Sequence, residues 1–150
     1  MNSRTHEDLV LRDVYRLQNP RCEIYDIVLH HLPRWLQKDS RPWNCQLHHI
    51  IHHCGRIDVL SNLIMVSSDI HVPWVHANPV DARIVCLHAK LRKREFNVGE
   101  LDRCFGKNRG SGQPVLAWIE EAKCSSWVYP LAEELIGALT GEKRKGGDVV

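Results

Sequence analysis

The chain has 150 residues, of which 43% are hydrophobic and 25% are charged, and its formal net charge at pH 7 is +2. This composition is that of an ordinary globular protein, and the length suits a single domain, residues 1–150. No apolar run approaches the length of a transmembrane helix, and the first four residues are too polar for a signal peptide, so we expect a cytoplasmic protein that contacts no membrane.

Residues 1–42 are expected to form helices that support the rest of the domain. Between positions 6 and 18, apolar residues recur at helical spacing: Leu9, Val10, Val14 and Leu17. Asn19 and Pro20 end this pattern. A second helix is expected from about Cys22, with an interruption at Pro33. Its stripe consists of Ile24, Ile27, Val28, His31, Leu32 and Trp35.

Residues 43–80 hold six of the ten histidines and are expected to form a hairpin followed by a helix. Gln46–Ile51 and Asn62–Val66 are two short apolar segments of strand length, and each is followed by polar or glycine residues. Ser67 and its polar neighbours suit a helix cap, and Pro73 suits a first helical turn. A helix is therefore expected from about residue 72 to residue 79. In such a unit, the histidines of the first strand can meet those at the start of the helix.

The order and spacing of five polar residues in this stretch form its most specific pattern: His48, His49, Asn62, His71 and His76. This succession resembles the HNH endonucleases, which are members of the ββα-metal (His-Me finger) nucleases. The segment Trp74–Pro79, with the sequence WVHANP, resembles small phage-type members in particular. The resemblance implies an α+β fold, in which a mainly helical domain surrounds a ββα-metal hairpin-helix unit. It also implies a protein that is phage-encoded and acts in the host cytoplasm.

The resemblance assigns a role to each of these residues. His49 would be the general base, and Asn62 would brace the loop and orient His49. His48 and His71 would bind a metal ion, with His76 as the second ligand on the helix side. The family usually places three residues between its last two histidines, whereas four intervene here. A five-residue offset turns two side chains apart on an α-helix, so His76 can join the site only if His71 lies just before the first turn.

The chemistry of phosphodiester hydrolysis explains why these residue types are needed. Water needs a base to remove its proton, and the phosphate and the leaving oxygen need a cation. Histidine is a suitable base at neutral pH. Because adjacent strand residues point to opposite faces, a bulge or a strand end must re-aim either His48 or His49. An imidazole ligand set favours zinc or nickel, and the family resemblance also admits magnesium or manganese.

Residues 81–112 form a basic segment directly after the histidines. From Ala82 to Arg109 there are eight Lys or Arg residues against three acids. Phosphate contacts to DNA are expected here. The candidates are Arg83, Lys90, Arg92, Lys93 and Arg94. The glycine-rich loop at 106–112 has no Gly-Lys-Ser/Thr ending. Its functional interpretation is a mobile loop that touches DNA, and the alternative is a plain connector.

The C-terminal part, residues 113–140, is expected to form two helices. Apolar residues repeat at helical spacing from Pro114 to Lys123 and from Pro130 to Leu139. Residues 141–150 are charged and contain glycine, so we expect a frayed, flexible tail. The six cysteines contain no Cys-x-x-Cys pair and are expected to be free, buried thiols.

Together these features predict an HNH endonuclease that uses one divalent metal ion (Zn, Ni, Mg or Mn) to hydrolyse double-stranded DNA. Two alternatives remain open at this stage. One is a non-catalytic DNA-binding protein whose histidines hold a structural zinc ion. The other is a phage assembly or packaging protein with a degenerate HNH fold. The sequence leaves open whether RNA is a substrate, and it does not indicate the oligomeric state.

Overall fold

The structure is a computed structural model that describes residues 6–32, 34–37, 44–106 and 111–141. The expected linker at 38–42, the interruption at Pro33, most of the loop at 106–112 and the tail after Gly141 lie outside the described residues. The α-helices are α1 (His6–Gln18), α2 (Tyr25–Val28), α3 (Ser68–Ile70), α4 (Pro79–Arg92), α5 (Val98–Cys104), α6 (Gln113–Glu121) and α7 (Tyr129–Thr140). The strands are β1 (Cys45–His49) and β2 (Leu63–Ser67), and a π-helical turn, η4 (His71–His76), follows α3.

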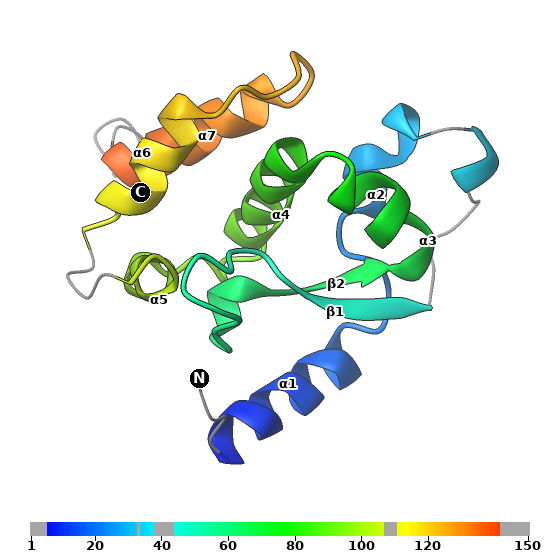
Figure 1. Cartoon of the computed structure of the whole chain (residues 1–150), viewed down its shortest axis with the longest axis horizontal. Helices are drawn as coiled ribbons and strands as arrows, with labels where there is room; N and C mark the ends of the chain where they lie inside the picture. The colour runs from blue at the N-terminus through cyan, green and yellow to red at the C-terminus, as the bar shows by residue number, and fades with distance from the viewer. Residues whose placement is uncertain (1–5, 33, 38–43, 107–110, 142–150) are drawn as a thin grey trace.

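The fold is α+β, with helices packed around a two-stranded antiparallel sheet (Figure 1). The register of β1 against β2 runs without a bulge from Cys45 opposite Ser67 to His49 opposite Leu63. Both strands lie within one or two residues of their predicted positions. The hairpin is therefore confirmed, and it presents one face to α1 and the other to α4 (Figure 1).

Helix α1 covers the lower face of the hairpin in Figure 1 with a different side from the one its apolar spacing predicted. Tyr15 packs with Leu63 and Met65 of β2, and Leu11 lies against this cluster. Val10, Val14 and Leu17 of the predicted stripe are exposed instead, and Leu17 is 81% exposed. Tyr15 explains this orientation, because its hydroxyl donates to Glu23 and accepts from Lys90 in the interior of the protein.

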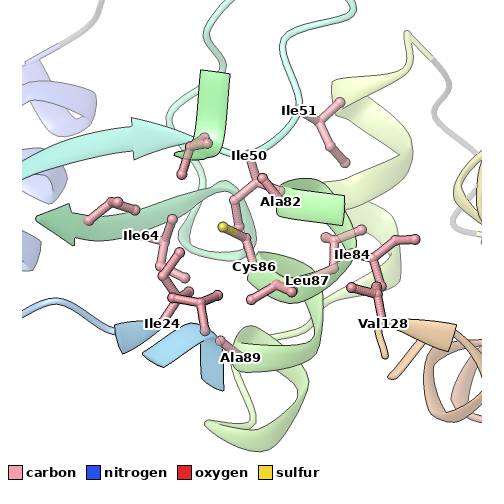
Figure 2. Packing of buried hydrophobic residues seen from close by; sticks show 14 of the residues in the cluster. Ile24, Ile50, Ile51, Ile64, Ala82, Ile84, Cys86, Leu87, Ala89 and Val128 are labelled. Atoms are coloured by element: carbon pink, nitrogen blue, oxygen red, sulfur yellow. The ribbon is translucent and has the colours of Figure 1, made fainter. Parts of the chain in front are cut away.

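The main hydrophobic core lies between the other face of the hairpin and α4. Ile64 of β2 and Ile24 point toward the α4 residues Cys86 and Ala89, as Figure 2 shows. On the far side of α4, Val128 packs into the same cluster (Figure 2). The segment after Pro79 has a sequence that suits either a helix or a strand. In the structure it is a central, largely buried helix that packs against η4.

The predicted second helix is mostly replaced by shorter turns. α2 has four residues and is followed by 3-10 turns at Leu29–His31 and Arg34–Leu36. Leu32 has extended backbone angles, φ −89° and ψ 153°. The ring of a following proline disfavours helical angles in the preceding residue, so Pro33 explains why Leu32 is extended after the Leu29–His31 turn. His31 is exposed and stacks on Trp127, rather than lying within the core.

The C-terminal half contains one helix that the sequence analysis did not predict. Asn97 caps α5 by accepting a hydrogen bond from the Glu100 backbone amide at 2.9 Å. This is a capping signature, Asn-x-x-Glu, that precedes helices in many proteins and was available in the sequence. α6 and α7 match their predicted ranges within a few residues. None of the described helices is both long enough and apolar enough to cross a membrane.

Cys22, Cys54, Cys86, Cys104 and Cys124 are free thiols, as expected, but they differ in exposure. Cys22, Cys86 and Cys104 are buried, and Cys54 is exposed. Burial raises the pKa of the Cys104 thiol to about 12, so this cysteine is a small core residue rather than a nucleophile.

Candidate functional site

The histidine-bearing helix begins earlier than predicted and changes its register within one turn. The Ser67 hydroxyl accepts a hydrogen bond from the Asp69 amide at 3.1 Å and starts α3 at Ser68. Residues His71–His76 then form the π-helical turn η4. Pro73 gives the physical reason, because it has no amide hydrogen and its ring collides with the carbonyl four residues earlier in an α-helix.

This π turn brings His71 and His76 together despite their five-residue offset. In an α-helix with 3.6 residues per turn, that offset rotates two side chains about 140° apart. In a π-helix, the backbone bonds join residues five apart, so such residues lie one above the other. The two rings are accordingly 4.6 Å apart between centroids. The expectation that the offset separates these histidines is therefore wrong.

His48 of β1 completes a cluster of three imidazoles. Its Nδ1 lies 3.1 Å from Nε2 of His71, and the two ring centroids are 4.9 Å apart. On the other side of the His71 ring, the Gln46 side-chain oxygen lies 2.7 Å from Nδ1. Because an amide oxygen only accepts, His71 carries its proton on Nδ1 and presents the lone pair of Nε2 to His48. Such a partner on the second nitrogen is the usual way in which a ligand histidine is oriented.

The surroundings of the cluster favour the neutral form of His48 and of His71. Burial lowers the pKa of His48 most strongly, and repulsion by a protonated His71 lowers it further, to about 3. Burial and the neighbouring His76 lower the pKa of His71 below its ordinary value as well. At neutral pH these rings carry lone pairs instead of positive charge, which is the state that metal ligation requires.

The nitrogens of His48, His71 and His76 are the candidate donors of a metal site. Within the described ranges, no group of three or more His, Cys, Asp or Glu side chains is arranged to hold a metal ion. Two nitrogens bound to one tetrahedral ion at ~2.1 Å lie roughly 3.4 Å apart, close to the 3.1 Å between His48 Nδ1 and His71 Nε2. These two nitrogens share one proton in a hydrogen bond, and an ion between them would replace that proton. The donor chemistry of the imidazoles fits a divalent ion.

His49 is the last residue of β1 and pairs with Leu63 in the regular register, so no bulge re-aims it. Its Nε2 lies 2.6 Å from Oδ1 of Asp58, and both side chains are buried, with 8% and 1% exposed. Arg12 of α1 places its Nε 3.9 Å from the same oxygen. The imidazole next to the cluster is thus held by a carboxylate from the loop between the strands.

Asn62 is fully buried and holds that loop to the sheet. Its side-chain oxygen accepts from the Ile51 amide at 2.7 Å, and its side-chain nitrogen donates to the carbonyls of Ile51 and Ile57 at 2.9 and 3.0 Å. Its backbone carbonyl accepts from the Ile50 amide. One side chain therefore fixes both ends of the loop that follows His49.

Two adjoining cavities surround the histidine cluster. The first, about 510 Å³, is lined by residues of α1, β1, the loop and η4: Arg12, Arg16, Cys45, Gln46, Leu47, His48, His49, His52, Arg56, His71 and His76. The second, about 410 Å³, shares four of these and reaches α4: His48, Ile50, His52, Arg56, Val75, His76, Pro79, Ala82 and Arg83. Among the residues whose side chains the structure describes, both linings contain guanidinium groups and no carboxylate. Such a surface attracts an anionic ligand.

The predicted DNA-contacting residues divide into two groups. Arg83 lines the second cavity and lies 4.6 Å over the ring of Trp118, which orients it. Arg92 and Arg94 are exposed, and Arg92 lines a different cavity, together with residues 18–27. The expected cationic surface along residues 90–94 therefore does not adjoin the histidine cluster.

The structure corrects the assignment of Lys90 and changes that of Lys93. Lys90 is 0% exposed, and its ammonium donates to Glu95, Tyr15 and the Leu63 carbonyl, so it is unable to contact DNA. The Lys93 ammonium is paired with Glu23 and Glu95 at 2.5 and 3.4 Å. Counting charges along the sequence did not reveal that these lysines neutralise interior acids.

Four residues at the site were absent from the sequence prediction: Arg12, Arg16, Arg56 and Asp58. The two arginines of α1 lie four positions apart and thus on one side of the helix, which is a weak signal by itself. Asp58 lies between the two predicted strands, where polar residues indicate only the end of a strand.

Comparisons of the chain with family models, with curated proteins and with solved structures gave no match.

Proposed function

We propose that this protein is a metal-dependent endonuclease of the HNH type that hydrolyses phosphodiester bonds in DNA. One observation carries the proposal. The histidines of β1 and of η4 meet in cavities whose described lining includes four arginines and no carboxylate. Neutral imidazoles next to guanidinium groups suit a ligand that is both metal-seeking and anionic, as a phosphodiester is.

In this proposal, the segment from β1 through β2 to η4 is a ββα-metal unit. His48, His71 and His76 would hold one divalent ion, which would neutralise charge on the phosphate and on the leaving oxygen. His49 takes the proton of the attacking water. Asn62 supports His49 indirectly, through the loop that it binds at Ile51 and Ile57.

The arginines would bind the phosphates on either side of the scissile bond. Arg12 and Arg16 approach the cluster from α1, whereas Arg83 approaches it from α4. Arg56 lines both cavities between them. A guanidinium binds two phosphate oxygens at once, so this arrangement suits a nucleic-acid backbone that passes over the histidines.

The decisive experiment is cleavage of supercoiled plasmid by the purified protein with magnesium, manganese, nickel or zinc. We expect nicked or linear product with at least one metal. His49→Ala should slow cleavage by ~10²-fold or more, because a general base contributes that much, while metal binding measured by calorimetry persists. His53→Ala is the matched control, because His53 lies against Phe105 and lines neither cavity.

The absence of product with every metal, from protein that is folded and binds metal, would refute the nuclease proposal. A protein that unfolds on chelation would then favour a structural zinc site. Loss of metal binding together with activity in His49→Ala would refute the separate roles of His48 and His49. The same assay with a labelled RNA strand identifies the preferred nucleic acid.

A further inference from the structure

We propose that Asp58 is the positioning residue of His49 and fixes which nitrogen of this imidazole accepts a proton. The catalytic consequence rests on the nuclease function proposed above, whereas the structural part does not. The carboxylate oxygen Oδ1 lies 2.6 Å from Nε2 of His49, and the pair is shielded from water. A carboxylate accepts hydrogen bonds, so the imidazole carries its proton on Nε2. The lone pair is then on Nδ1.

The position of Asp58 is itself determined by the sheet. Asn62 Nδ2 donates to the carbonyl of Ile57, the residue before Asp58, at 3.0 Å. The Asn62 amide also donates to the carbonyl of Val59, the residue after Asp58, at 2.9 Å. Both neighbours of Asp58 in the chain are thus bound to Asn62, the residue directly before β2. The effect of Asn62 on His49 therefore passes through Asp58.

Arg12 connects this pair to α1. Its Nε is buried and makes no hydrogen bond, and it lies 3.9 Å from the Asp58 oxygen that holds His49. A buried carboxylate requires a nearby positive charge, which Arg12 supplies. The helix that lines the cavity with arginines thereby also supports the residue that orients the base.

The orientation has a chemical consequence. His49 removes a proton from water only if the nitrogen facing the substrate has a lone pair, and the partner of the opposite nitrogen decides this. In Asp58→Asn, the side-chain amide can turn its NH₂ group toward Nε2, and the imidazole proton then moves to Nδ1. An equivalent substitution in a Ser-His-Asp triad leaves the geometry intact and lowers kcat by about 10⁴-fold, because the tautomer is wrong.

The test measures the tautomer directly, in full-length, metal-free protein with ¹⁵N-labelled histidine. Two-bond ¹H–¹⁵N correlation spectra distinguish a proton on Nε2 from one on Nδ1. We expect Nε2–H for His49 in the wild type and Nδ1–H in Asp58→Asn. Asp102→Asn is the matched control, because Asp102 is also buried but accepts from the Gly112 amide and lines neither cavity.

The kinetic part compares the same variants in plasmid cleavage. Asp58→Asn should lower kcat by ~10²–10⁴-fold with KM changed less than about twofold, and Asp102→Asn should leave both close to wild type. A merely structural role would lower the melting temperature in both variants without changing the tautomer. Thermal unfolding is therefore recorded for each.

The possible outcomes separate the two proposals. A wild-type protein with Nδ1–H on His49, or a tautomer that is the same in Asp58→Asn, overturns the positioning role whatever the activity. A changed tautomer with unchanged kcat overturns its catalytic consequence. If the wild type cleaves no nucleic acid, the nuclease proposal fails, and the wild-type tautomer still decides whether Asp58 positions His49. Should Asp58→Asn not fold, the wild-type spectrum decides in the same way.

Discussion

Replacement of Asn62 by alanine should destabilise the protein far more than the loss of an ordinary asparagine. Three side-chain hydrogen bonds disappear, and they leave the Ile51 amide and the carbonyls of Ile51 and Ile57 without these partners. Each lost bond to a backbone group inside the protein costs ~1 kcal/mol or more. The free energy of unfolding should therefore fall by about 3 kcal/mol.

Chemical denaturation followed by circular dichroism measures this loss. For a domain of this size, ~1 kcal/mol corresponds to a melting temperature change of about 2–4 °C, so Asn62→Ala should melt roughly 6–12 °C lower. Asn97→Ala is the control, because Asn97 is exposed and only caps α5, a contribution of about 1 kcal/mol. If Asn62→Ala lost no more stability than Asn97→Ala, Asn62 would not be the brace of this loop.

Two further predictions follow from the distribution of charge. Arg16→Ala and Arg83→Ala should each weaken DNA binding and reduce the salt dependence of the affinity by about one phosphate contact, whereas Lys93→Ala should leave the affinity unchanged. Fluorescence anisotropy at several salt concentrations measures these affinities. Equal losses of affinity in all three variants would contradict the prediction. The second concerns pH. The pKa of His48 is about 3 in the folded protein and ~6.5 in the unfolded chain. Between pH 6.5 and pH 3 the unfolded chain therefore binds more protons, so the stability falls as the pH is lowered through this range. The free energy of unfolding falls by at most ~1.4 kcal/mol per pH unit. His48→Gln should therefore flatten the profile of stability against pH between pH 7 and pH 4. An unchanged profile would show that another group is responsible.

Local patterns in the sequence were sufficient for the hairpin and for three helices. Two apolar segments of strand length, separated by polar residues and glycine, predicted β1 and β2 within a residue or two. Helical spacing also predicted α1, α6 and α7. These features depend on residues close in the chain, so their spacing alone indicates them. The same applies to α5, whose capping residue Asn97 was present in the sequence but was overlooked.

The composition of the candidate site depended on contacts between distant segments. Lys90 is bound to Tyr15, 75 positions away, and this burial removes a cation that charge counting assigned to DNA. Arg12 reaches the site because α1 packs on the hairpin through Tyr15 rather than through its predicted stripe.

The sequence by itself determined which residue types carry the chemistry and in which order they occur along the chain. Only the tertiary structure decided that His71 and His76 share one face, because a π turn at Pro73 replaces the expected α-helical register. It also decided that Asp58 meets His49, because Asn62 binds the loop on both sides of that carboxylate. The physical reason is common to both cases. Hydrophobic periodicity reports burial within one segment, whereas the partner of a polar group is set by how the segments pack.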